Sequence, residues 1–284
     1  MNPATPVDIV RMTDLVADRS VREEGCLSPI IDVFAKELEA THEAAFKVAY
    51  DLNRVALAAW MEGPNEGADI DPGPITNRLM IRAINNYGGA VLLARRGMDA
   101  ESQTLSRTIY ECAFWLGLFA HDGASALNAF LVQNARSVAE HTIMLGQQGL
   151  ASEAEIEKAQ DTIKTLEKVK VPGMYRMAER ANLLPLMPHY KVLCGMAAHS
   201  SLSSLNRYMD KRDDGMLGHQ MDFAGERIPE SLAFAITGLV CALQEWQKSS
   251  FVPIDEAKLD AALDATRAMF GEEQEPPQGF TRER

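Results

Sequence analysis

One stretch of the sequence pairs a cation with a carboxylate inside an otherwise apolar run. Arg107 and Glu111 stand four residues apart in RTIYECAFWLGLF, which covers residues 107–119. At about 100° of rotation per residue, both side chains share one helical face with Trp115. Burying a charge is unfavourable unless the charge is paired and hydrogen-bonded. The spacing therefore predicts an internal arginine–glutamate pair that needs a polar group from a second helix.

Three polar residues further along the chain are candidates for that partner: Tyr190, His199 and Ser203. Two interpretations stay open. In the first, the pair and its partner form a structural network that fixes the register of the helices. In the second, the groups line a polar cleft in which Glu111 tunes the protonation of His199 for acid–base chemistry. Solvent access to His199 and its distance from Glu111 would separate the two interpretations.

Helices must position these groups, and the sequence carries clear signals for their ends. Ser28 and Pro29 form a typical helix start, Gly97 is a left-handed stop, and Asp99 and Ser152 are predicted N-cap residues. Between these signals, apolar residues recur at helical spacing. Helices are expected over residues 30–61, 75–96, 100–119, 125–147, 152–169, 174–182, 189–208, 229–248 and 254–270.

These helices are long and their connections are short, as in antiparallel bundles. The helix at 100–119 is apolar almost all round, which predicts that it is the central one. We expect an all-α fold, a single bundle of about eight to ten helices over residues 28–270, preceded by an N-terminal arm at 1–27. Residues 210–225 are predicted to form a loop with room for a short hairpin, and residues 271–284 a disordered tail.

The order of the polar residues resembles a known family. The run that starts at Arg107 is followed by YKVLC at 190–194 and AHS at 198–200. This order resembles the bacterial domain-of-unknown-function family 5677, in which an Arg-x-x-x-Glu helix precedes a Tyr-x-x-Leu-(Ser or Cys) helix ending in His and a small residue. This chain has Ser200 where many members have proline.

The resemblance would extend over residues 30–250. It implies a helical fold and no particular reaction. It also implies a polar centre, which in this sequence falls on Arg107, Glu111, Tyr190 and His199.

Helical bundles of this kind are also similar, more distantly, to the HEPN superfamily, whose ribonucleases use an Arg-x(4 to 6)-His motif. Arg136 and His141 fit that spacing, and so do Arg212 and His219. Short patterns of this kind arise often by chance. Residues five apart lie about 140° apart on a helix, so Arg136 and His141 converge only with help from the backbone or a second subunit. The structural alternative is an exposed Arg136 beside Glu140, with His141 half-buried.

Composition limits the partners. The chain has 284 residues and a net charge of −12, which opposes binding to duplex DNA. A single-stranded RNA held by a few local arginines is compatible with that charge. No apolar stretch approaches the roughly 20 residues that cross a bilayer, so no membrane span is expected. The four cysteines contain no CxxC pair, which indicates a reduced cytoplasmic protein; they are Cys26, Cys112, Cys194 and Cys241.

Metal and cofactor sites are not expected. Glu39 and His42 form one Glu-x-x-His pair, whereas di-iron bundles need two such pairs and further carboxylates. Asp69 and Asp71 are better explained as turn residues. The sequence contains no HExxH motif, no glycine-rich phosphate loop and no GxSxG.

Two functions remain as hypotheses. The first is a HEPN-like, metal-independent ribonuclease of single-stranded RNA, in a toxin or phage-defence setting. His199 or His141 would be the general acid/base, Arg107 or Arg136 would stabilise phosphate charge, and Glu111 would orient the base. This hypothesis requires a solvent-open cleft, which we expect at the interface of a homodimer.

The second hypothesis is a non-catalytic helical module that binds a protein partner or a small ligand. Here the four residues of the polar centre form a specifying network inside the fold. It predicts that these groups are paired and sealed from solvent.

Overall fold

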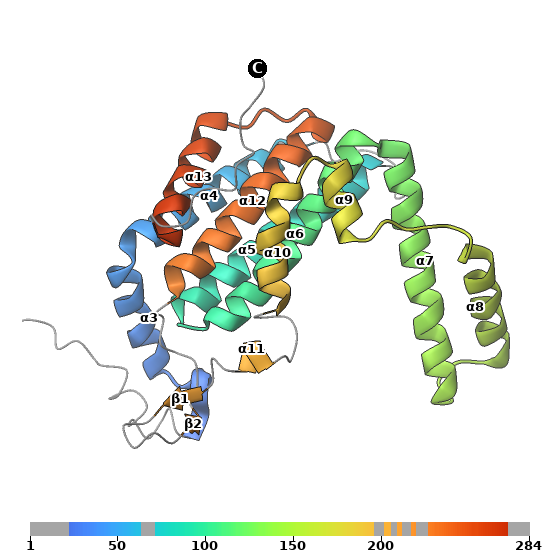
Figure 1. Cartoon of the computed structure of the whole chain (residues 1–284), viewed down its shortest axis with the longest axis horizontal. Coiled ribbons are helices and arrows are strands. Elements are labelled where there is room, and N and C mark those ends of the chain that lie inside the picture. The colour runs from blue at the N-terminus through green and yellow to red at the C-terminus, as the bar shows by residue number, and fades with distance from the viewer. Residues whose placement is uncertain are drawn as a thin grey trace, which may run out of the picture.

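The computed structural model describes residues 23–63, 72–195, 202–205, 209–211, 217–219 and 227–271, and helices dominate it (Figure 1). Its long helices are α3 (Ile30–Thr41), α4 (Glu43–Met61), α5 (Pro72–Arg95), α6 (Asp99–His121), α7 (Gly123–Gln147), α8 (Glu153–Leu166), α12 (Ile228–Ser250) and α13 (Glu256–Phe270). The shorter ones are η1 (Gly25–Leu27), α9 (Met174–Arg180), η2 (Leu184–Leu186), α10 (Met187–Leu193) and α11 (Leu202–Leu205). The predicted all-α bundle is confirmed.

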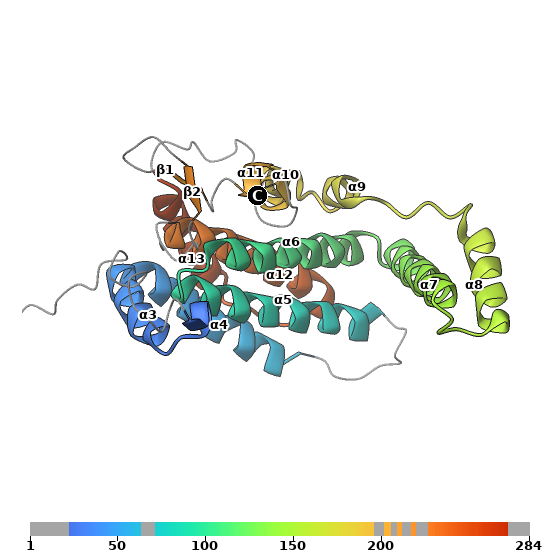
Figure 2. The same cartoon turned by 90° about the horizontal axis from the view of Figure 1, so that it is seen from below.

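Helices α5, α6 and α12 run side by side through the middle of the bundle (Figures 1 and 2). Their sequences explain this position, because α6 and α12 are apolar nearly all round and bury most of their residues. The prediction that 100–119 forms a central helix is therefore confirmed, and α12 shares that place. The two helices approach closely at Gly238, where an added Cβ would lie 2.9 Å from the Tyr110 ring.

Residues 30–61 form two helices, α3 and α4, and not the single helix that was predicted. A single helix was expected over residues 30–61, but the chain changes direction at His42, which has φ −113° and ψ 32°. The hydroxyl of Thr41 donates to the carbonyl of Glu37 at 2.8 Å, a side-chain bond that is known to bend helices. Because of the bend, α3 packs on α5 while α4 continues along α5, α12 and α13.

The helix ends follow the sequence signals at Gly97 and Ser152 but not at Ser28 and Asp99. Helix α3 begins at Ile30, and its N-cap residue is Pro29, which makes no side-chain cap hydrogen bond. Gly97 has a positive φ of 74°, as a left-handed stop requires. Ser152 caps α8 through a complete capping box with Glu155. Asp99, by contrast, does not cap α6: it is the first residue of the helix, and its carboxylate accepts a hydrogen bond from the backbone N–H of Arg227 at 3.1 Å. The prediction for Asp99 was wrong because a distant chain segment supplies a competing donor.

The segment between α6 and α12 supplies two further parts. Helices α9 and α10 pack along α6. A short antiparallel hairpin of β1 (Met209–Lys211) and β2 (Leu217–His219) lies where a loop with a hairpin was predicted.

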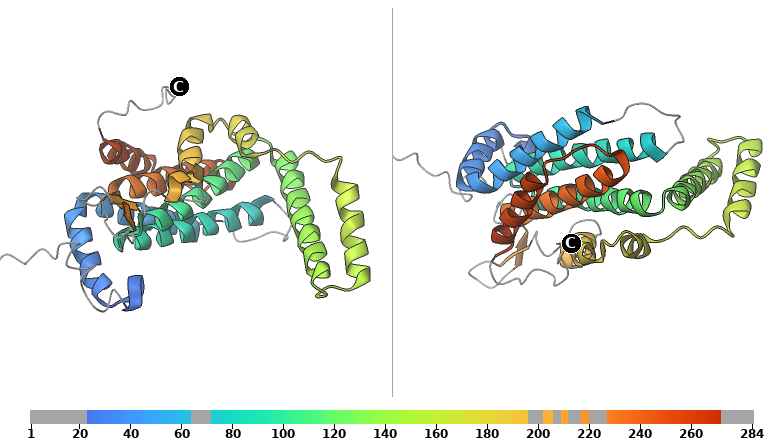
Figure 3. Two further views of the ribbon diagram at one scale, coloured as in Figure 1. Left: turned by 60° about the horizontal axis from the view of Figure 1, so that its bottom comes forward. Right: turned by 90° about the horizontal axis from the view of Figure 1, so that it is seen from above.

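Helices α7 and α8 form an antiparallel hairpin that projects from the bundle (Figure 3). At its root, the partly buried Leu127 and Phe130 pack against the core. Further out, α7 and α8 pack on each other through small residues, among them Ala139 and Ala159, and Ile156 fills the space beside Gly146. We call this projecting pair of helices the arm.

Parts of the predicted domain layout fall outside the described residues. These are residues 1–22 of the N-terminal arm and residues 272–284 of the tail. The proposed boundaries at 28 and 270 therefore stay predictions.

Candidate functional site

The arginine and glutamate of α6 meet a tyrosine of α10. Nη2 of Arg107 lies 2.8 Å from Oε1 of Glu111, one helical turn away. The hydroxyl of Tyr190 donates to the same oxygen of Glu111 at 3.0 Å, and it accepts from Nη2 of Arg107 at 3.3 Å. The predicted pair and one of its three candidate partners are thus brought together. We call Arg107, Glu111, Tyr190 and Cys194 the α6–α10 network.

The tyrosine is held by its ring as well as by its hydroxyl. The guanidinium carbon of Arg107 stands 5.5 Å from the centre of the Tyr190 ring, within the range of a cation–π contact. Phe114 packs against the same ring in a T-shaped arrangement, with centroids 5.5 Å apart. Burial, and next the charge of Glu111, raise the pKa of Tyr190, so the phenol stays protonated and acts as a donor.

Cys194 is a member of this network that the sequence interpretation missed. Nε of Arg107 donates to its sulfur at 3.1 Å. Burial lowers the pKa of Arg107, but the hydrogen bond to Cys194 and the charge of Glu111 outweigh that effect and raise it. Cys194 is half-buried, unlike the fully buried Cys112, whose pKa burial raises to about 12. The Arg107–Cys194 contact could not be read from spacing, because it joins residues 87 positions apart.

The burial of the pair differs from the sequence interpretation. The carboxylate was expected inside the core, but Arg107 keeps 27% and Glu111 24% of the side chain exposed. Trp115, one turn further on, is 5% exposed. The α6 face that carries the pair is therefore partly open at its Arg107 end, where Tyr190 of α10 and Cys194 contact it.

His199 lies outside the described residues, as does the Ser203 side chain. The role predicted for His199 therefore stays a prediction. Helix α10 ends at Leu193, and the described residues that follow it stop at Gly195, four residues before His199.

Arg136 and His141 lie apart from this network, on the arm. Nη2 of Arg136 donates to the backbone carbonyls of Leu166 and Val169, at 2.8 and 3.2 Å. The guanidinium therefore satisfies carbonyls at the end of α8, which is a common use of a cation at a helix C-terminus. His141 is exposed on α7.

His189 is a second residue that the sequence interpretation did not single out. Its Nδ1 lies 3.2 Å from the Tyr110 hydroxyl, and its ring contacts Phe234 and Phe270 at centroid distances of 5.4 and 5.2 Å. Tyr110 is fully buried. Adjacent residues of α10 thus face two different surroundings, with Tyr190 on the charged pair and His189 in an aromatic cluster.

The surroundings of His189 predict a pH-dependent stability. Burial lowers its pKa below the ordinary value of 6.5, so the folded state holds the neutral form. The contribution of His189 is therefore complete above about pH 6.5 and declines as the pH falls and the unfolded chain takes up the proton. We expect His189→Gln to flatten the fall in melting temperature between about pH 7 and about pH 5.

The control for this measurement is His141→Gln, because His141 is exposed. That variant should keep the wild-type slope of melting temperature against pH. Parallel curves for His189→Gln and wild type would show that His189 does not control the slope.

Glu245 is a buried carboxylate at the other end of the bundle. It is 4% exposed, and Nζ of Lys248 lies 2.6 Å from its Oε1. Its second oxygen lies 3.8 Å from Nε2 of His121 and has no hydrogen-bond partner among the described residues. The ion pair with Lys248 compensates the charge. The nearby thiol of Cys241 is buried, and burial together with the charge of Glu245 raises its pKa to about 12, so it stays protonated.

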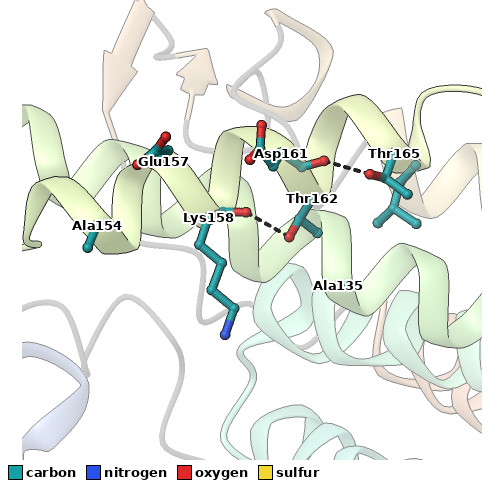
Figure 4. Close-up of a pocket in the computed structure, with 8 residues that line it drawn as sticks. Ala135, Ala154, Glu157, Lys158, Asp161, Thr162 and Thr165 are labelled. Atoms are coloured by element: carbon teal, nitrogen blue, oxygen red, sulfur yellow. Dashed lines mark hydrogen bonds between the residues drawn. The ribbon is translucent and has the colours of Figure 1, made fainter.

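A groove of about 540 Å³ lies between α7 and α8 (Figure 4). Its hydroxyl groups are already used, since Thr162 donates to the carbonyl of Lys158 at 2.9 Å and Thr165 to that of Asp161 at 2.8 Å. The groove is lined by Ala135, Ala154, Glu157, Lys158, Asp161, Thr162, Thr165 and Leu166, and therefore by none of the predicted site residues.

In the described part of the chain, no three His, Cys, Asp or Glu side chains are placed to hold one metal ion. In the same ranges, every helix is too short or too polar to cross a membrane.

Comparison with known proteins gives one match. Residues 75–216 match the model of a family of unknown function, DUF5677. The matched range includes Arg107, Glu111, Tyr190 and His199. It is shorter than the span of 30–250 expected from the motifs. No curated protein and no solved structure matches the chain.

Proposed function

The chain belongs to the family of unknown function DUF5677, and from its site we propose that it is a non-catalytic helical module that binds a protein partner. One observation carries this proposal. A single oxygen of Glu111 accepts hydrogen bonds from both Arg107 and Tyr190, so the polar groups of the α6–α10 network bind one another.

Catalysis would use the same groups differently. A general base needs a lone pair directed at the substrate, and an arginine that stabilises phosphate needs charge that is not already compensated. Here the Arg107 charge is neutralised by Glu111 at 2.8 Å, and Tyr190 remains a protonated donor. The network therefore supports a structural role.

That role is to hold α10 on α6. Helix α10 has only seven residues, and so short a helix is unstable by itself in water. The contacts of the Tyr190 ring with Arg107 and Phe114, together with its hydroxyl bonds, fix the position and rotation of α10. The network thus sets where the chain leaves α10 toward residue 196.

The class of partner follows from charge and surface. A net charge of −12 opposes nucleic acid, whose affinity depends on lysine and arginine contacts to phosphate. The arm exposes three large apolar side chains of α7, Leu131, Val138 and Met144, at 38%, 58% and 57% exposure. Apolar surface of this kind marks contacts with other proteins.

A second candidate is the HEPN-like ribonuclease of single-stranded RNA. The exposure of Arg107 and Glu111, each about a quarter, favours it, because a substrate phosphate could reach the guanidinium from solvent. In that mechanism His199 or His141 would be the acid/base, and Glu111 would orient it.

The deciding experiment combines RNA cleavage in EDTA with thermal melts of wild type, Glu111→Gln and His199→Ala. We expect no cleavage by any of them. We also expect Glu111→Gln to melt roughly 2–4 °C lower, because losing a partly exposed ion pair and its tyrosine bond costs about 1 kcal/mol.

The matched control is Glu157→Gln on α8, an exposed glutamate with no ion pair shown in the structure, whose replacement should leave the melting temperature unchanged. Cleavage by wild type that is lost in a folded His199→Ala or Glu111→Gln variant would overturn the proposal and establish the ribonuclease. Equal melting of Glu111→Gln and Glu157→Gln would show that the network does not hold α10.

A further inference from the structure

Two adjacent side chains of α10 attach this short helix to the bundle. Tyr190 belongs to the α6–α10 network, whereas His189 enters a second site that three other helices form. There, Nδ1 of His189 lies 3.2 Å from the hydroxyl of Tyr110 on α6. Its ring contacts Phe234 of α12 and Phe270 of α13. We call these four residues, His189, Tyr110, Phe234 and Phe270, the His189 site.

The hydrogen bond between Tyr110 and His189 has a definite direction. Burial raises the pKa of Tyr110 well above its ordinary value, so the hydroxyl keeps its proton. A hydrogen bond from Thr237 of α12 acts on that pKa in the opposite direction, which identifies the tyrosine oxygen as the acceptor of that bond. The proton of Tyr110 is therefore donated to Nδ1, and the neutral ring carries its own proton on Nε2.

A proton on Nδ1 of His189 is incompatible with this arrangement. The imidazolium ion has an N–H on both ring nitrogens, so Nδ1 would direct a donor at the donor of Tyr110. The tyrosine could accept from it only by turning its own proton away, toward the hydroxyl of Thr237 that already donates to it. Protonation therefore breaks a hydrogen bond on α6.

Among the described residues, no charged side chain compensates a proton on the ring. The neighbours from α12 and α13 are the hydrocarbon rings of Phe234 and Phe270. Cys241 of α12, which acts on Tyr110, is buried, and burial raises its pKa to about 12, so it is neutral. Burial is also the cause that lowers the pKa of His189. The site thus accepts the neutral ring and excludes the cation.

We propose that His189 is a pH-sensitive switch for α10, which is docked while the ring is neutral and is released when the ring takes up a proton. This inference rests on the proposed role of the α6–α10 network and describes its regulation. Because Tyr190 follows His189 directly, release of the histidine also withdraws the tyrosine from Arg107 and Glu111.

The length of α10 makes this release local. A helix of seven residues does not stay formed by itself in water, so α10 loses its structure once its two side-chain contacts are lost. The long helices α6 and α12 bury most of their residues and stay folded. Segments with few buried contacts open at a lower free energy than the core does.

Native-state hydrogen exchange of the full chain tests this switch. At pH 7, the amides of α10 should be less protected than those of α6, and low concentrations of urea should change their protection little, because a local opening exposes little surface. Between about pH 6.5 and about pH 5, the protection factor of α10 should fall by up to about tenfold per pH unit, because each opening takes up one proton. Protection factors are compared because they correct for the intrinsic effect of pH on exchange.

The variant that removes the switch is His189→Asn. Its side-chain oxygen can accept from Tyr110 in the place of Nδ1, and it does not titrate. The protection factor of its α10 should therefore stay constant over the same pH range. The matched control is His141→Gln, which removes an exposed histidine and should keep the wild-type slope. The wild-type slope is a test by itself and does not depend on how well a variant folds.

Different outcomes separate this inference from the proposed function. The switch is overturned by a wild-type α10 that is as protected as α6, by a wild-type protection factor that is independent of pH, or by equal slopes in wild type and His189→Asn. These results leave the protein-binding role untouched. RNA cleavage that depends on Glu111 or His199 overturns the protein-binding role itself, whatever the slope at α10.

Discussion

Replacing Phe114 with alanine is expected to lower the free energy of unfolding by about 3–5 kcal/mol. The side chain is fully buried in α6, so the change removes a large apolar group and leaves a cavity. It also removes the edge-on support of the Tyr190 ring, with centroids now 5.5 Å apart. Urea unfolding followed by circular dichroism measures the loss.

The same substitution at Phe251 is the control. Phe251 is 88% exposed, so Phe251→Ala should change the free energy of unfolding by no more than about 0.5 kcal/mol. The chemical change is identical at the two positions, whereas the burial of the ring is not. A loss at Phe114 below about 1 kcal/mol would contradict the packing of α10 on α6 described above.

Replacing Gly238 with alanine is expected to destabilise the bundle by about 1–3 kcal/mol, although alanine is the better helix former. The added Cβ would lie 2.9 Å from one ring atom of Tyr110 and 3.2 Å from Cγ2 of Ile109. Both neighbours are fully buried and have no room to retreat. The distance between α12 and α6 at Gly238 would have to increase.

Gly88→Ala on α5 is the matched control for this change. No atom lies within 4 Å of a Cβ added there, so the substitution should stabilise the protein by up to about 1 kcal/mol through helix propensity. The two glycine variants are thus expected to shift the melting temperature in opposite directions. A stabilising Gly238→Ala would show that α6 and α12 are further apart than the structure places them.

Local sequence signals predicted the helix ends well, because caps and stops act over a few residues. The capping box at Ser152 and the positive φ at Gly97 were both predicted in this way. The wrong prediction for Asp99 has its cause in a contact between residues far apart in the sequence. The backbone N–H of Arg227 competes for the Asp99 carboxylate across 128 positions, which no local pattern contains.

The candidate site was predictable in part for the same reason. The Arg107–Glu111 pair follows from an interval of four, and Tyr190 was one of three candidates for its partner. The membership of Cys194 depends on how α10 crosses α6, which requires three dimensions. The exposure of the pair was also unpredictable, since the apolar residues around it suggested complete burial and α10 covers only part of that face.

The small residues between α7 and α8 give the arm an independent dynamic character. Ala139, Ala159 and the Gly146–Ile156 contact bury far less apolar surface than the aromatic and leucine side chains of α6 and α12. Segments that bury little open by local unfolding at a lower free energy than the core does. We therefore expect the arm to open as a unit of its own, so that its amide hydrogens exchange ahead of those in the central helices. Arg136 of α7 donates to the carbonyl of Leu166 at the end of α8 and to that of Val169 just beyond it, and so holds the end of α8 against α7.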